Sequence, residues 1–407
     1  MDEVRSGQPR LRRRLSLPLL VLYGLGGTIG AGIYVLIGVT AGAAGVYAPA
    51  AFLLAAVIMV FSASGFAEFA GRLPVSAGEA AYVRAGFETP WLGTFVGLLV
   101  VLAGSVSAAT VSVGSIGYLH FFVDVPTAPL IVLVVFVMGA IAAVGILESV
   151  MFASFLTLVE IGGLLVIIFG GFAGDFQLAD NLPSVFPLTL DGAVWAGVLG
   201  AGLFAFFAFI GFEDLVNVAE EVKQPEKTMP RAIFWTLGLT TLLYFLVVSV
   251  AVLTVPSQEL AASPAPLGLV FERVTSLPPA ALAAIAVVAT LNGIIIQMIM
   301  ASRVLYGLSM QGGLPRLLSY IHPLTRTPLV ATGLVVVLVL TLALVFPLDD
   351  LAKTTSRVTL TIFALVNVAL LKVKLMEEAP PTGLFLVPIW VPLVGFVACA
   401  AFLTFGG

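Results

Sequence analysis

Charged residues are scarce in this sequence. Asp, Glu, Lys and Arg make up 10% of its 407 residues, and hydrophobic residues make up 60%. Soluble globular proteins carry about 25% charged residues. This composition excludes an ordinary soluble domain and predicts an all-α polytopic membrane protein. We expect it to lie in a lipid bilayer and to bind no nucleic acid.

Cysteine and histidine are also rare. The single cysteine, Cys399, excludes an intrachain disulfide and gives no reason to expect a disulfide-linked subunit. The two histidines, His120 and His322, fall in predicted loops on opposite sides of the membrane, and no HExxH motif occurs. An intramembrane enzyme needs a nucleophile with a base, or metal ligands, at depth. We therefore expect no enzyme, no metal site and no cofactor.

Long apolar segments fill most of the chain. A membrane-spanning helix needs about 20 predominantly apolar residues. The sequence predicts about 11 such helices, and no loop between them is long enough for a soluble domain. The predicted spans are 18–43, 47–69, 91–118, 127–146, 150–173, 193–220, 231–255, 278–302, 328–346, 352–371 and 384–403.

The basic residues predict the orientation of the chain. With the N-terminus in the cytoplasm, all but three of the 18 Lys and Arg residues fall on the cytoplasmic side, the exceptions being Arg273, Lys353 and Arg357. Cytoplasmic loops carry an excess of Lys and Arg. We therefore expect a multi-pass protein of the cytoplasmic membrane whose tail, 1–17, is cytoplasmic.

The first span contains an unusual run of glycines, GLGGTIGAGIY, from Gly24 to Tyr34. At about 1.5 Å per residue, this run lies near the middle of the membrane. One interpretation is close helix packing, because Gly26 and Gly30 form a GxxxG pair. The other is a helix broken in mid-membrane, whose freed N–H groups hold a carboxylate. We predict the break.

A second candidate break lies five spans later. In GAGLFAFFAFIGFED, Gly211 falls in mid-span and is followed by Glu213 and Asp214. Buried carboxyls are costly unless they face a polar interior. Matching breaks in two halves are typical of inverted-repeat transporters. We therefore expect a first repeat at 18–173, a second at 193–371, and an additional helix at 384–403.

Four motifs resemble the amino acid–polyamine–organocation (APC) superfamily. GTIGAGIY is similar to its first helix, and FAFIGFEDLVNVAEEVKQPEKTMPRAI is similar to its sixth helix and the following loop. GRLPVSAGEAAYVRAGF and ASRVLYGLSMQGGLP are similar to its loop between helices two and three and to the region after helix eight. The motifs occur in the family's order and span nearly the whole chain.

The resemblance implies a LeuT-type five-plus-five inverted repeat with helices 1 and 6 broken, and an amino-acid substrate. It places the substrate carboxylate at the backbone amides of Gly30, Ala31 and Gly32. It places the substrate ammonium at freed carbonyls. These carbonyls belong to Thr28, Ile29, Phe207 and Ile210.

The chain departs from the family in two respects. Many members have twelve helices, whereas this chain has eleven predicted spans. Some proton-coupled members carry a lysine in helix five, where this chain has Glu160. A protonated lysine is positive and a protonated glutamate is neutral, so the lysine mechanism does not transfer. Glu160 either fixes helix packing, or carries a proton or forms part of a cation site.

Other polar and aromatic residues complete the predicted site. Glu213 and Asp214 would point about 100° apart on a helix, so we expect only one of them to face the pathway. The resemblance implies that this is Glu213, in coupling or gating, because the family motif has an acid there beside the pocket. The alternative is that Glu213 satisfies backbone groups freed by the break. Phe207 is also a candidate pocket wall. Asn292 and Gln297 either line the pocket or form interhelical hydrogen bonds. We expect an apolar pocket for the substrate side chain.

These observations predict a secondary amino-acid transporter that works by alternating access around helices 1 and 6. Proton symport is the expected coupling mode. The alternatives are sodium coupling, exchange, transport of a polyamine or another amine, and a transport-inactive sensor. H+ or Na+ would act only as a coupling ion.

Overall fold

The computed structural model describes residues 15–75, 78–144, 149–174, 178–322, 325 and 327–405. The described part of the chain is helical and contains no β-strand beyond a single bridge between Leu15 and Val222. Of the predicted tail 1–17, residues 1–14 lie outside the described residues, as does Arg326.

Each predicted span overlaps a helix, and the largest difference is in the sixth span, 193–220, because α8 ends at Phe209. The described residues contain seven stretches that are long and apolar enough to cross a membrane, together with four shorter apolar helices. The long helices are α1 (Leu17–Ala44), α2 (Ala48–Arg72), α4 (Pro90–Leu119), α5 (Thr127–Val144), α6 (Ser149–Ala173), α8 (Gly192–Phe209), α9 (Pro225–Thr254), α12 (Pro279–Met310), α13 (Leu329–Val345), α14 (Leu348–Met376) and α15 (Trp390–Phe405).

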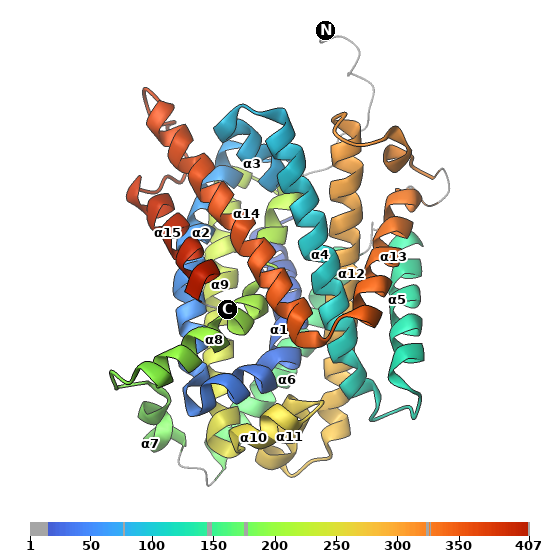
Figure 1. Cartoon of the computed structure of the whole chain (residues 1–407), viewed down its shortest axis with the longest axis vertical. Helices are drawn as coiled ribbons and strands as arrows, with labels where there is room; N and C mark the ends of the chain where they lie inside the picture. Colours follow the sequence, from blue (N-terminus) through green and yellow to red (C-terminus); the bar gives the residue numbers. More distant parts are fainter. Residues whose placement is uncertain are drawn as a thin grey trace.

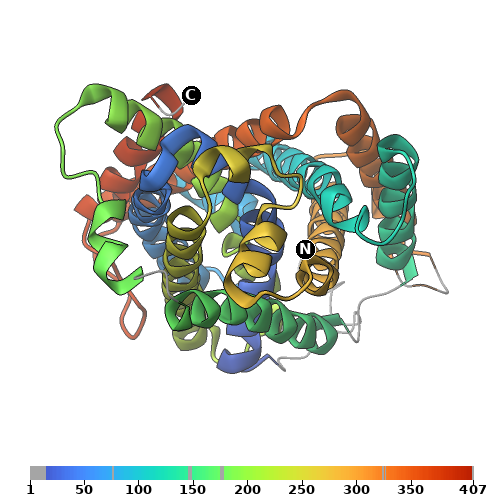
Figure 2. The same ribbon diagram turned by 90° about the horizontal axis from the view of Figure 1, so that it is seen from below.

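Short helices cover the two ends of this bundle. α10 and α11 lie at one end, below α1 in Figure 1 and across the bundle in Figure 2, whereas α3 lies at the other end. The short elements are η1 (Gly45–Tyr47), α3 (Gly78–Phe87), α7 (Leu178–Asn181), η2 (Leu182–Val185), η3 (Glu213–Glu221), α10 (Ser257–Ala262), α11 (Pro266–Thr275) and η4 (Arg316–Ser319).

Helices from the two halves of the chain pack in matching pairs. α1 packs on α8, α2 on α9, α4 on α12 and α5 on α13; the last two pairs lie side by side in Figure 1. In each pair the partners occupy the same position in their respective sets of five spans. This arrangement is the one expected of a LeuT-type inverted repeat. The proposed halves, 18–173 and 193–371, correspond to α1–α6 and α8–α14, and α15 follows them.

The first helix is not broken. α1 is helical from Leu17 to Ala44, so the break predicted in helix 1 is wrong. Its glycines instead allow close approach to other helices. A Cβ at Gly30 would lie 2.7 Å from the Ala289 carbonyl oxygen, and one at Gly32 would overlap the Ala208 backbone. Without a Cβ, α1 approaches α12 and α8 at backbone distance, which is the packing interpretation of the glycine run.

The sixth span is broken as predicted. α8 ends at Phe209, Ile210 is extended, and the 3₁₀ segment η3 begins at Glu213. Between them Gly211 has φ +128°, a conformation that L side chains rarely adopt. A Cβ at Gly211 would also lie 2.6 Å from the carbonyl carbon of Gly27. The break therefore lies directly against the glycine run of α1.

Candidate functional site

One tyrosine joins the break to the first helix. The Tyr244 hydroxyl of α9 lies 2.8 Å from the carbonyl oxygen of Thr28 and 2.9 Å from that of Ala208. A tyrosine hydroxyl has one proton to donate, so the two carbonyls share one donor. The predicted carbonyl of Thr28 therefore lies at the junction of α1, α8 and α9.

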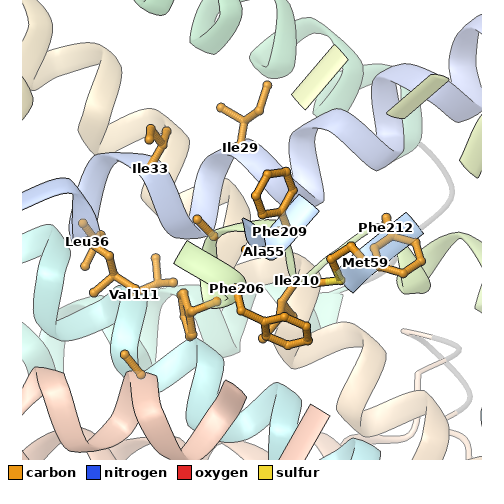
Figure 3. Close-up of a cluster of buried hydrophobic side chains, with 14 of the residues drawn as sticks. Ile29, Ile33, Leu36, Ala55, Met59, Val111, Phe206, Phe209, Ile210 and Phe212 are labelled. Carbon is orange, nitrogen blue, oxygen red and sulfur yellow. The ribbon is translucent and has the colours of Figure 1, made fainter. Parts of the chain in front are cut away.

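The other backbone groups predicted for the substrate lie on both sides of this junction. Gly30, Ala31 and Gly32 are inside α1, where helical amides bond to carbonyls four residues earlier. These amides, and the carbonyls of Thr28 and Ile29 in the same helix, are not freed by a break, contrary to the expectation. Ile29, Phe207 and Ile210 are buried. Figure 3 shows Ile29 and Ile33 of α1 with Phe206, Phe209 and Ile210 in one apolar cluster, so this region is closed.

Glu160 lies on α6 and is fully buried. Its Oε1 accepts a hydrogen bond from the Asn292 Nδ2 of α12 at 3.1 Å, whereas its Oε2 has no hydrogen-bond partner. No Lys or Arg forms a salt bridge with it in the described part of the chain. An isolated buried carboxylate is costly. Asn292 was predicted to line the pocket or to form an interhelical hydrogen bond. It forms such a bond, to the predicted coupling carboxyl of Glu160.

Two tyrosines connect Glu160 to the core of the bundle. The Tyr34 hydroxyl of α1 donates to the Glu160 backbone carbonyl at 3.0 Å, and the Tyr118 hydroxyl donates to the Tyr34 carbonyl at 2.6 Å. A Cβ at Gly26 would overlap the Thr157 side chain, one helical turn before Glu160. A movement of α1 would therefore change the surroundings of Glu160.

A second group of carboxyls lies on the other side of the break. The Glu213 Oε2 accepts from the Gly211 backbone N–H at 2.9 Å, and the Asp214 Oδ2 accepts from the Gln297 Nε2 at 3.0 Å. Both acids line the same small cavity. Both acids reach one cavity although consecutive residues of a 3₁₀ helix point about 120° apart. That Glu213 is the acid that faces the transport pathway stays a prediction.

A third carboxyl, which the sequence did not predict, reaches this cavity from outside the membrane spans. Glu79, on α3, is 2% exposed and lines the cavity with Glu213, Asp214 and Gln297. Burial, with a smaller contribution from Glu213, raises the pKa of Glu79 to about 8. Its only signal was its place in the motif GRLPVSAGEAAYVRAGF, which showed neither its burial nor its neighbours.

Known proteins resemble this chain over nearly its whole length. The family model described as "Amino acid permease" matches residues 15–406. A branched-chain amino acid permease of Bacillus subtilis is 30% identical over 398 residues, covering 92% of this chain and 84% of that protein. This chain belongs to the amino acid permease family. The predicted resemblance to the APC superfamily is thereby confirmed.

A longer plant protein and one solved structure also match this amino acid permease over most of its length. A mitochondrial cationic amino acid transporter of Arabidopsis thaliana is 28% identical over 408 residues, covering 93% of this chain and 65% of that longer protein. A Na+-coupled sialic acid symporter, solved in a substrate-bound outward-open state, superposes with a TM-score of 0.62 at 15% identity. The match covers 95% of this chain and 88% of the symporter chain. At this identity the likeness shows the fold alone, which confirms the LeuT-type class.

Proposed function

We propose that this amino acid permease is a secondary active transporter that moves an amino acid across the cytoplasmic membrane by alternating access, in symport with protons. Its membership of the family supports the substrate class. The break in the sixth span, packed against the first helix, supports a site between them, because transporters of this architecture bind substrate at such breaks. The distribution of Lys and Arg supports a cytoplasmic N-terminus.

The observation that carries proton coupling is the environment of Glu160. It is buried, makes one hydrogen bond through Oε1, and faces no cation among the described residues. A neutral, protonated carboxyl costs much less to bury here than an ionised one, which would need a cation or more donors. We propose that Glu160 carries the coupling proton, with Asn292 holding it and Tyr34 linking it to α1.

The substrate would lie between the break and the glycine run of α1. We propose Thr28, Ile29, Gly30, Ala31 and Gly32 on one side, and Phe207 and Ile210 on the other, with Asn292 and Gln297 nearby. The surrounding side chains are apolar (Figure 3), which favours an apolar amino acid. The B. subtilis relative is named for branched-chain amino acids, which agrees with this proposal.

One observation favours a second candidate, a cationic amino acid or an amine. Three carboxyls, Glu79, Glu213 and Asp214, line a cavity beside Ile210, and they could receive a positively charged side chain. Some relatives are named for cationic amino acids. An amine substrate would need no carboxylate, so uptake of decarboxylated analogues separates it from an amino acid.

Uptake into liposomes tests the proposal. The purified protein is screened with all standard amino acids under an inward proton gradient, a sodium gradient, or neither. We expect proton-driven accumulation of an apolar amino acid. In Glu160→Gln, we expect accumulation to be lost while exchange of preloaded substrate is retained, because a glutamine cannot release a proton.

Glu272→Gln is the matched control, since Glu272 is an exposed carboxyl on α11. It should accumulate substrate like the parent protein. Unchanged accumulation by Glu160→Gln would overturn the role of Glu160, and sodium-driven accumulation would overturn proton symport. The absence of saturable uptake or exchange for every amino acid would overturn the substrate class.

A further inference from the structure

The cavity on the α3 side of the break contains acids without a base. Glu79 of α3 and Glu213 and Asp214 of η3 line it together, and each is at most 8% exposed. No Lys or Arg within the described ranges forms a salt bridge with any of the three. Like charges that share a buried site cannot all ionise, so at least one of these carboxyls must hold a proton while the cavity is closed.

An unpaired hydroxyl in the same cavity is a second, independent observation. Thr359 of α14 is 2% exposed, lines the cavity, and its Oγ1 has no hydrogen-bond partner. Its neighbours Thr355 and Thr361 each donate to the carbonyl four residues earlier, as threonines in helices commonly do. The Thr359 hydroxyl is therefore available to a group inside the cavity.

The size of the cavity selects its occupant. Its volume of about 20 Å³ is enough for one water molecule, which needs about 10–15 Å³ and two or more polar partners. The Thr359 hydroxyl and the carboxyl oxygens supply those partners. A larger group, such as a lysine side chain, would require the cavity to open.

We propose that this cavity holds one exchangeable proton, shared by Glu79, Glu213 and Asp214 through a single water molecule. The proton stays bound while the cavity is buried, because the three carboxyls cannot all ionise there. It would leave to bulk water once the cavity is hydrated, because each carboxyl then ionises. The site is distinct from Glu160, and the inference does not require that transport itself be proton-coupled.

Among the residues that the structure describes, few other titratable groups face this cluster. Tyr82 of α3 lies within electrostatic range of Glu79, and Asn217 of η3 is the polar neighbour of Glu79. α12 contributes Gln297 and α14 contributes Thr359, neither of which titrates, and the residues of α4 that line the cavity are apolar. The carboxyls themselves therefore determine the pH dependence of the site.

Infrared difference spectroscopy of the purified full-length protein tests the proposal. The protein carries Glu160→Gln, so that the buried Glu160 carboxyl does not contribute, and Glu68 is held ionised by its salt bridges to Arg72 and Lys374. We expect the protonated-carboxyl band to disappear in a titration between about pH 6 and 9, the range documented for buried glutamates. Adding Glu79→Gln or Asp214→Asn should move the midpoint down by about one pH unit or more, because a like charge is removed.

The matched control Glu272→Gln should leave the midpoint unchanged. The absence of a titration in this range overturns the proposal. This measurement uses the protein with Glu79, Glu213 and Asp214 unchanged. A midpoint unmoved by both neutralising variants also overturns it. So does calorimetric binding of Na+ or L-lysine that Glu79→Gln abolishes, since the cavity would then hold that cation. None of these readouts involves transport, so a failure here is distinct from a failure of the transport assay.

Discussion

Two amide side chains of α12 each hold one buried acid. Asn292 donates to Glu160 on one side, and Gln297 donates to Asp214 on the other. Glu160, Asn292 and Gln297 could be selected from the sequence because polar residues are rare in these spans. Which of these side chains form hydrogen bonds with each other could not be predicted. The contacts join residues 132 and 83 positions apart, and such distances depend on helix packing that no local pattern encodes.

Tyr244→Phe tests the junction between the break and α1. The substitution removes the donor to the Thr28 and Ala208 carbonyls. The Thr28 carbonyl keeps its helical donor, whereas the Ala208 carbonyl at the end of α8 loses the tyrosine as its donor. An unsatisfied buried acceptor costs about 1–3 kcal/mol. We expect a lower melting temperature together with a raised KM for substrate, because the Thr28 carbonyl belongs to the proposed site.

Tyr118→Phe is the control for that prediction. It removes a buried hydrogen bond of the same kind, to the Tyr34 carbonyl. It should lower the melting temperature without the change in KM. Equal effects of the two variants on KM would contradict a substrate-binding role for the junction at Tyr244.

At the scale of elements, a glycine run in a membrane span can mark either a break in the helix or close packing of an intact helix, and the sequence alone does not distinguish the two. In the sixth span, Gly211 turns the chain at a positive φ. In α1, glycines leave the helix intact and let α8 and α12 approach its backbone. The break after α8 could be predicted because two acids follow it. The continuity of α1 could not, since it depends on which backbones lie opposite.

Gly211→Ala tests the break. The new Cβ would require an unfavourable positive φ and would lie 2.6 Å from the Gly27 carbonyl carbon. We expect it to abolish uptake. Gly200→Ala is the matched control in α8, because nothing lies within 4 Å of a Cβ there. Wild-type uptake by Gly211→Ala in liposomes would contradict the requirement for this geometry.

At the scale of the whole molecule, one buried ionic network joins distant parts of the chain. Glu68 of α2 is fully buried and contacts Arg72 and Lys374, each at 2.7 Å. Its Oε2 accepts from the Val387 backbone N–H at 2.8 Å, just before α15. Arg72 also pairs with Glu377 at 2.9 Å. The network thus holds α2, α14 and the approach to α15 together.

Glu68→Gln should destabilise the protein strongly. Removing one partner of a buried ion pair costs about 3–5 kcal/mol, because charges remain buried without compensation. Glu377→Gln should lower the free energy of unfolding by only about 0–1 kcal/mol, since Glu377 is partly exposed and Arg72 retains its salt bridge to Glu68. Thermal unfolding in detergent measures both. Similar losses for the two variants would contradict the central place of Glu68.

The pH dependence of Glu377 has a definite sign. The hydrogen bonds from Arg72 lower the pKa of Glu377, so its contribution to stability is present above the ordinary glutamate pKa and is lost as the pH falls through the lowered value. Glu377→Gln should therefore reduce the loss of melting temperature on acidification. An unchanged acid limb in that variant would contradict this contribution.

The general organisation of the molecule could be predicted because hydropathy fixes the spans. All eleven predicted segments overlap helices, the sixth being interrupted after α8. The packing of α10 and α11 over one end, and of Glu79 into the bundle at the other, could not be predicted. Both lie in segments between spans, where composition shows a loop but not what it covers.

Substrate-driven proton movement tests the central claim most directly. Liposomes that contain the protein and a trapped pH dye receive the transported amino acid at equal pH inside and outside, without sodium. Proton symport predicts that the lumen acidifies as substrate enters, and that Glu160→Gln abolishes the acidification. Substrate entry without acidification, or only when sodium is present, would contradict proton coupling.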